Sequence, residues 1–285
     1  MATAKSETKK DLALKEEQTT AVAVVSPDMF AADAGQGMEG AGQESFAIPF
    51  LAVLQKGSPQ VDEASGQMIE GAKAGMFFEN VTNRMYDGKS GVKIVPCAYR
   101  RVFLRWGPRS GEGAGFKGEL TADVVAAMRA EGKIVDLDGK LFVPLPDGTV
   151  NDKKCDRISD TRNHYVLLID ESTGAWTQAL LSLTSTQIKK SKMLMSALAS
   201  VKLKGQAGLY TPPTFANVVL ARTIPEANDK GTWHGVKFEI AGQVDRTEVY
   251  VAAKAFHASA ASGAVEAKYE DVGEAGASGS DKEGF

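Results

Sequence analysis

The segment Val92–Trp106 constrains the fold more than any other part of the chain. It is a run rich in β-branched, aromatic and aliphatic residues, with arginines between them, and this composition predicts one long strand. Side chains in a strand point alternately to opposite faces. One face holds Tyr99, Arg101, Phe103 and Arg105, and the other holds Arg100, Val102, Leu104 and Trp106. The second set predicts a core face with one charge at its edge.

Aromatic rings and guanidinium groups alternate along the first face, which is typical of single-stranded nucleic-acid binding. Exposed bases stack on aromatic rings for roughly 1–3 kcal/mol each, and cations between the rings meet phosphates. The same pattern also fits an amphipathic strand whose arginine stems lie over a second hydrophobic layer. Both interpretations remain open from this segment alone.

The net charge of −3 hides a strong segregation of charge. Residues 84–109 contain seven Lys/Arg and one acid, which gives +6, and residues 187–204 contain five Lys and no acid, which gives +5. The remainder of the chain therefore carries −14. Two basic regions in an acidic molecule predict a local positive field that attracts an anionic partner.

Length and composition predict one domain of about 200 residues with tails at both ends. Residues 1–45 are poor in large apolar groups, so we expect a disordered arm. No apolar run is long enough to span a membrane, and the start of the chain has no signal-peptide core. Cys97 and Cys155 have no metal-ligand or redox spacing, which favours reduced thiols in a cytoplasmic protein.

The remaining pattern predicts an α+β fold with a mainly antiparallel sheet, either a barrel or a strongly curved sheet, and two or three helices. The expected domain covers 46–262, and residues 117–160 are expected to be an insertion. We expect strands at 74–81, 164–170, 175–183, 215–223 and 232–244, and helices at 121–131, 186–201 and 247–261. A small hairpin is expected at 134–143 and a hairpin turn at 86–91. Loops are expected at 151–160 and 225–231, and a bulge at Gly235. Thr121, Thr184 or Ser185, and Thr247 are the expected helix caps.

No constellation for catalysis is visible in the sequence. His164, His234 and His257 lie in three separate predicted elements without a metal-ligand spacing. Gly88-Lys89-Ser90 lacks the upstream glycine and the following helix of a phosphate-binding loop. We therefore expect a protein that is not an enzyme and that uses no cofactor and no metal.

The last part of the chain, 263–285, is predicted to be a flexible acidic tail. Residues 266–285 contain six acids and two lysines and end in Phe285. A terminal aromatic gains little in water, but it can anchor in a partner's pocket while neighbouring charges steer the encounter. Asp281, Glu283 and Phe285 are therefore candidates for binding a partner protein, and the tail is also expected to compete with nucleic acid for the basic face.

The chain resembles bacteriophage single-stranded DNA-binding proteins. The similarity rests on the segment Tyr99–Trp106 and on the ending Ser280–Phe285, and 184–192 and 231–235 look like segments of phage replication-region proteins. The resemblance implies an OB-like barrel with a basic, aromatic face and an acidic tail ending in phenylalanine. It also implies replication or recombination proteins as partners of the tail, in the cytoplasm of the host cell.

The expected function is sequence-independent binding of single-stranded DNA in phage replication or recombination. The DNA-binding candidates are Arg84, Lys93, Tyr99, Arg101, Phe103, Arg105, Trp106, Arg109, Lys189, Lys190, Lys192, Lys202, Lys204 and Trp233. With about six phosphates neutralised, the slope of log K against log salt is expected near −4. Two alternatives stay open: a virion or scaffold-type structural protein, whose sheet packs against identical subunits, and a strand-annealing recombinase that forms rings. A homo-oligomer is compatible with all three, no membrane partner is expected, and a preference for DNA over RNA is not determined.

Overall fold

The computed structural model describes residues 27–42, 45–108, 112–229, 231–265 and 267–269. Contacts divide the chain into two units, Met1–Ala41 and Gly42–Phe285. The described part of the first unit contains one short helix, α1, Pro27–Ala32. Most of the arm expected at 1–45 lies outside the described residues, and so does the tail from residue 270 onward.

The second unit contains a large sheet, two small sheets and three further helices among its described residues. The strands are β1 Leu51–Val53, β2 Phe77–Glu79, β3 Arg84–Tyr86, β4 Val92–Trp106, β5 Phe116–Leu120, β6 Val135–Leu137, β7 Lys140–Val143, β8 Asp156–Ile169, β9 Trp176–Thr184, β10 Leu203–Gly205, β11 Gly208–Tyr210, β12 Asn217–Asn228 and β13 Gly231–Gln243. The helices are α2 Ala122–Ala130, α3 Ile188–Ser200 and α4 Thr247–Ser262, with short 3-10 turns η2 Ser185–Gln187 and η3 Thr214–Ala216.

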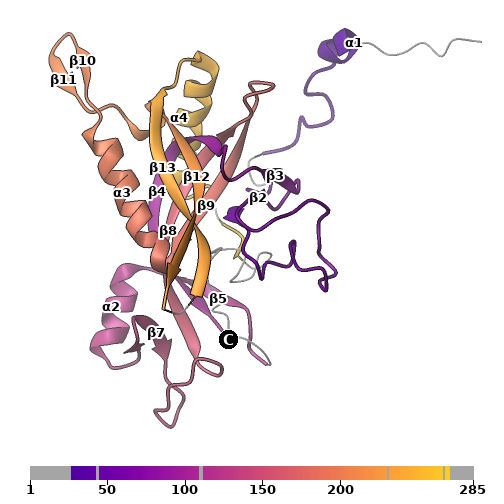
Figure 1. Ribbon diagram of the computed structural model, residues 1–285. Helices are drawn as coiled ribbons and strands as arrows, with labels where there is room; N and C mark the ends of the chain where they lie inside the picture. Colours follow the sequence, from indigo (N-terminus) through magenta and orange to yellow (C-terminus); the bar gives the residue numbers. More distant parts are fainter. Residues whose placement is uncertain (1–26, 43–44, 109–111, 230, 266, 270–285) are drawn as a thin grey trace, which may run out of the picture. The chain divides into compact units, whose positions relative to one another are not determined.

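The large sheet has the order β13-β12-β4-β8-β7-β6, and β5 and β9 add to β4 and β8. The ladders between the described strands are antiparallel. The predicted α+β class with a mainly antiparallel sheet is therefore confirmed, and β4 has the bounds that its composition predicted. As Figure 1 shows, β4 and β8 form the long centre of this sheet.

The sheet is curved, but among the described residues it does not close into a barrel. Helix α3 packs against β13 and also against β8 and β9, so the sheet bends around the helix. No ladder joins β9 to β13 in the described part of the chain. Instead, the segment around β1 lies between them, with a single parallel bridge from Phe50 to Leu180 and side-chain hydrogen bonds from Gln55 to the backbone of His234.

Two hydrophobic clusters lie on the two sides of the curved sheet. The concave cluster takes side chains from β4, β8, β9, β12 and β13, and Leu194 and Leu198 of α3 close it. The convex cluster contains Tyr165 and Leu167 of β8 under Phe256 of α4. Because both faces of these strands are buried, their sequences are nearly continuous apolar runs.

A bulge in β4 sets which side chains face which side. The register of β4 on β8 shifts between Pro96 and Ala98, so Cys97 is the extra residue and its side chain is buried in the convex cluster. From Tyr99 onward, the odd-numbered residues of β4 face the α3 side of the sheet. The predicted alternation is therefore correct, and the bulge determines the side to which it points.

Three predicted connections are wrong. Asp87-Gly88 does form a tight turn, with the Asp87 carboxylate accepting from Ser90, but β3 pairs with β2 rather than with β4, so the turn links two sheets. The expected loop at 151–160 ends early because β8 begins at Asp156, and the loop at 225–231 is short because β12 continues to Asn228. The bulge expected at Gly235 lies elsewhere, opposite Val218/Val219.

The segment between β5 and β8 contains a small helix and hairpin that cover one end of the long strands. Asp138 and Gly139 both have positive φ and form the predicted hairpin turn between β6 and β7. Thr121 caps α2, and its hydroxyl accepts a hydrogen bond from the backbone N–H of Val124 at 3.3 Å. Val125 of α2 then packs on Phe103 of β4.

Replacing Thr121 by alanine is expected to lower the free energy of unfolding by about 1 kcal/mol, because one helix N–H loses its acceptor. Urea denaturation measures the change. The matched control is Thr121→Ser, which keeps the hydroxyl and is expected to remain close to the original stability. Equal destabilisation by both substitutions would show that the methyl group, and not the cap, matters.

The other two helix caps differ from the prediction. Neither Thr184 nor Ser185 makes a side-chain capping bond; the chain instead enters α3 through η2. Helix α4 begins at Thr247, with Arg246 as the residue before it, and Gly263, which has a positive φ, caps its end after Ser262. None of the described helices is long and apolar enough to cross a membrane.

Candidate functional site

Tyr99 lies on β4 at the border of the region of the sheet that α3 covers. Tyr99 is 37% exposed, and its ring packs at 5.2 Å against the ring of His164 on β8. His164 is fully buried, and its Nε2 lies 2.8 Å from the hydroxyl of Ser191 on α3. Burial, together with the positive charge of Arg162, lowers the pKa of His164 to about 4. The imidazole is therefore neutral at physiological pH and acts as a spacer between the sheet and the helix.

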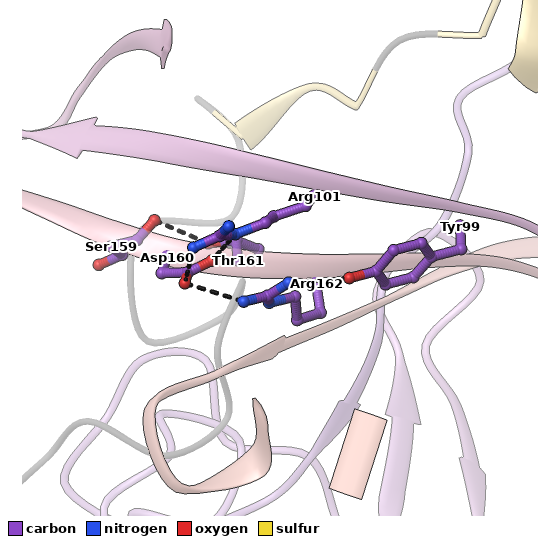
Figure 2. Close-up of polar contacts among 6 residues, drawn as sticks. All are labelled: Tyr99, Arg101, Ser159, Asp160, Thr161 and Arg162. Atoms are coloured by element: carbon purple, nitrogen blue, oxygen red, sulfur yellow. Dashed lines mark hydrogen bonds and ion pairs between the residues drawn. The ribbon is translucent and has the colours of Figure 1, made fainter. Parts of the chain in front are cut away.

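Two arginines share one carboxylate beside Tyr99 (Figure 2). Arg101 of β4 donates to both oxygens of Asp160, from Nε at 3.1 Å and from Nη2 at 2.8 Å. Arg162 donates to the same carboxylate at 3.0 Å and to the hydroxyl of Tyr99 at 2.9 Å. The hydrogen bond to Asp160 raises the pKa of Arg101. The guanidinium of Arg101 also lies 4.8 Å above the ring of Phe103.

A second cluster of the same composition lies four residues further along both strands. Arg105 and Lys117 both pair with Asp156, at 2.6 Å in each case. Arg105 is thus on the predicted face, but its charge is shared with a carboxylate. Four residues of strand correspond to about 13 Å, so the two clusters are separate.

Two predicted stacking residues are buried, which corrects the sequence analysis. Phe103 is 5% exposed because Val125 of α2, Leu141 of β7 and Ile158 of β8 cover it. Trp106 is 3% exposed and packs on Phe116 in the convex cluster. Neither ring can stack on a base in this arrangement. Of the four residues on the predicted face, Tyr99 is the exposed aromatic.

The lysines of α3 and the following hairpin divide into paired and unpaired side chains. Lys190 pairs with Glu226 of β12 at 2.6 Å. Lys189, Lys192 and Lys204 are exposed, and no carboxylate partner is found for them among the described residues. Lys202 is exposed and donates to the hydroxyl of Thr211 and to the carbonyl of Ala199. Four of the five predicted lysines therefore have no carboxylate partner within the described part of the chain.

Trp233 and Lys190 come together, but in a structural contact. Trp233 is half-buried, and its indole N–H donates to Glu226 at 3.0 Å, on the same carboxylate that holds Lys190. Gln187, at the start of α3, accepts from the backbone N–H of Val236. These contacts fasten the start of α3 to the β12–β13 hairpin.

The structure separates two further candidates from this region. Lys93 is near the other end of β4 and pairs with Glu171. Two hollows, of about 420 Å³ and 370 Å³, flank that ion pair, and Arg84 lines the larger one. Arg109 and the tail residues Asp281, Glu283 and Phe285 lie outside the described residues.

We call Arg101, Arg162, Lys189, Lys192, Lys202 and Lys204, together with Tyr99, the basic strip. The contacts Tyr99–His164 and His164–Ser191 join its sheet end to α3. The β10–β11 hairpin follows α3 directly and extends it (Figure 1). The guanidinium groups and the exposed ring of the strip thus lie on β4 and β8, and its ammonium groups lie along α3 and in the segment that follows it.

The basic strip contains cationic side chains and one exposed aromatic ring. The described residues contain no group of three or more His, Cys, Asp or Glu side chains that could hold a metal ion. His164 is buried under Tyr99 and α3, so it has no route to a substrate. Guanidinium and ammonium groups beside an exposed aromatic ring fit phosphates and bases.

A family model matches residues 16–266, which is most of the chain; its description is Pam3 phage gp34-like protein. The chain belongs to this family. No curated protein and no solved structure matches the chain. The family is named for a phage protein, in agreement with the phage resemblance of the sequence, and its description states no activity.

In this gp34-like chain, sequence reasoning missed Arg162 and Asp160. Both lie in the segment 156–163, which is polar enough to look like a loop at its start. One available signal is that Asp160, Arg162 and His164 alternate with smaller residues as in a strand, which would place the three on one face. Nothing in the sequence indicates that Arg162 pairs directly with Arg101 across the two strands.

Proposed function

We propose that the chain binds single-stranded DNA without sequence preference along the basic strip. The observation behind this proposal is that Lys189, Lys192 and Lys204 are exposed without a carboxylate partner among the described residues. They lie on the helix and hairpin that the contacts Tyr99–His164 and His164–Ser191 join to the exposed ring and the two arginines. Unpaired surface cations attract a polyanion, and a ring among them can stack on a base.

The connectivity of the sheet also supports this proposal. Apart from the shorter strands β5–β7, β10 and β11, the chain runs through β4, β8, β9, β12 and β13 in turn. These five strands lie in the order β9-β8-β4-β12-β13, and α3 is between β9 and β12. The OB fold has this five-stranded Greek-key order with a helix between its third and fourth strands, and it is common among oligonucleotide-binding proteins. An open, OB-like sheet with α3 at its concave side is the fold that we infer for the family. Fold alone does not establish function, so the proposal depends on the charges.

Binding is expected to weaken steeply with salt. If Arg101, Lys189, Lys192, Lys202 and Lys204 each neutralise one phosphate, the slope of log K against log salt is about −3.5 for a single strand. Fluorescence anisotropy with labelled oligo-dT at several salt concentrations measures this slope. Duplex DNA and an RNA of the same length are the comparison ligands. No binding to oligo-dT at low salt, or tighter binding to the duplex, would contradict the proposal.

One observation favours a second candidate, self-assembly as in a structural protein. Leu209 is 74% exposed at the end of the β10–β11 hairpin, and Tyr210 beside it is 48% exposed. An exposed aliphatic and aromatic pair on a projecting hairpin is suited to contact another copy of the chain. Sedimentation with and without oligo-dT separates the two candidates. If the chain assembles in the absence of DNA and does not bind oligo-dT, self-assembly is favoured.

Recruitment of replication or recombination proteins by the acidic tail remains part of the first proposal.

A further inference from the structure

Arg101 and Arg162 lie directly opposite each other on neighbouring strands, on the same face of the sheet. Like charges at such a position repel each other and destabilise the pairing. The face therefore requires an anion, and the carboxylate of Asp160 supplies it, with hydrogen bonds of 2.8–3.1 Å from both guanidinium groups. One carboxylate for two guanidinium groups still leaves one positive charge uncompensated within this group of three.

Arg162 is held in an unusual state for an arginine. It is only 9% exposed, and its Nε is buried without a hydrogen-bond partner among the described residues. An unpaired buried donor is costly, so this guanidinium depends on the Asp160 carboxylate and the Tyr99 hydroxyl that its two terminal nitrogens bind. The Tyr99 hydroxyl fixes Arg162, and the ring of Phe103 supports Arg101, so both donors are already oriented.

We propose that Arg101 and Arg162 form a phosphate-binding site, and that the Asp160 carboxylate holds the place of the phosphate in the structure. A phosphodiester of the bound strand displaces the Asp160 carboxylate and takes over its hydrogen bonds. Guanidinium groups match phosphate and carboxylate with the same two-pronged geometry, so the exchange preserves the contacts. This inference rests on the proposed function and names one contact within it.

Glu239 provides a matched comparison elsewhere on the sheet. It is also shared by two cations, Arg222 and Lys237, each at 2.7 Å. These side chains project from the opposite face, since the neighbouring Ala221 and Phe238 belong to the concave cluster. Glu239→Gln thus removes the same charge and frees the same number of cations as Asp160→Asn, but away from the basic strip.

The first experiment compares the full-length chain with its Asp160→Asn and Glu239→Gln variants in anisotropy titrations with oligo-dT. Asp160→Asn is expected to tighten binding about three- to tenfold, because the phosphodiester no longer has to displace a carboxylate from the two guanidinium groups. Glu239→Gln is expected to change the affinity by less than twofold. Adding Arg101→Gln to Asp160→Asn is expected to remove the gain. Equal affinities for the two single variants would overturn the site.

A second measurement uses inorganic phosphate and does not depend on DNA. Phosphate is expected to raise the melting temperature of Asp160→Asn more than that of the unaltered chain or of Glu239→Gln. If no variant binds DNA but phosphate stabilises Asp160→Asn alone, the phosphate site stands and the proposed function falls. If DNA binds but phosphate gives Asp160→Asn no extra stabilisation, the proposed function stands and the site falls.

Discussion

Replacing Lys189, Lys192 and Lys204 together by glutamate is expected to weaken binding to single-stranded DNA at least hundredfold at 0.1 M salt. Each released counterion contributes roughly 0.7 log unit at that concentration relative to 1 M, so three lost contacts amount to about two log units. Repulsion by the new carboxylates adds to the loss. All three side chains are exposed, so the fold should not change. Anisotropy with oligo-dT measures the affinity, and circular dichroism checks the fold.

The matched control is the triple variant Lys56→Glu, Lys73→Glu, Lys254→Glu. These lysines are also exposed and lie outside the basic strip. The net charge of the chain changes by the same amount, so the control separates the strip from the overall charge. We expect a loss of less than about fivefold, from long-range repulsion alone. Equal losses in the two triple variants would contradict a DNA path along α3.

The folded chain is expected to lose about 3 kcal/mol of stability between pH 7 and pH 4 through His164 alone. Burial lowers the pKa of His164 from 6.5 to about 4, so in this range the unfolded chain binds a proton that the folded chain does not. The stability is complete above pH 6.5 and falls as the pH is lowered towards 4. Protonation would also place a positive charge beside Arg162 and disturb the contact with Ser191 of α3.

Urea denaturation at pH 7.5 and pH 4.5 tests this expectation in the His164→Gln variant. Glutamine can still bond Ser191 but does not titrate, so the variant should lose about 2–3 kcal/mol less than the unaltered chain between the two pH values. His257→Gln is the control, because His257 contacts the carbonyl of Cys97 on the other side of the sheet. The same pH dependence in the unaltered chain and in His164→Gln would rule out the buried imidazole as its source.

Local chemistry predicted the elements whose signals lie within a few residues. The bounds of β4 follow from its β-forming composition, the start of α2 from the hydroxyl of Thr121, and the β6–β7 turn from Asp138-Gly139. Each of these features depends on the backbone preferences of neighbouring residues. The class of the fold follows from them, because alternating strands with short turns favour antiparallel pairing.

The errors concern residues whose environment is made by distant segments. The alternation that places Phe103 with Tyr99 and Arg101 is correct, but α2 folds back over Phe103 and buries it. Arg105 and Lys190 were expected to meet phosphates, and carboxylates on β8 and β12 pair with them instead. Period and composition describe one strand at a time, so they do not reveal which acid lies across from which arginine.

The contacts of the segment 49–55 have a consequence for the sheet as a whole. The backbone N–H of Leu180 donates to the carbonyl of Pro49 at 2.8 Å, and the Gln55 side chain binds both the N–H and the carbonyl of His234. Edge strands with unpaired backbone groups are templates for intermolecular pairing and for aggregation. At Leu180 of β9 and His234 of β13, this short stretch therefore occupies backbone groups that would otherwise be open to pairing with another chain.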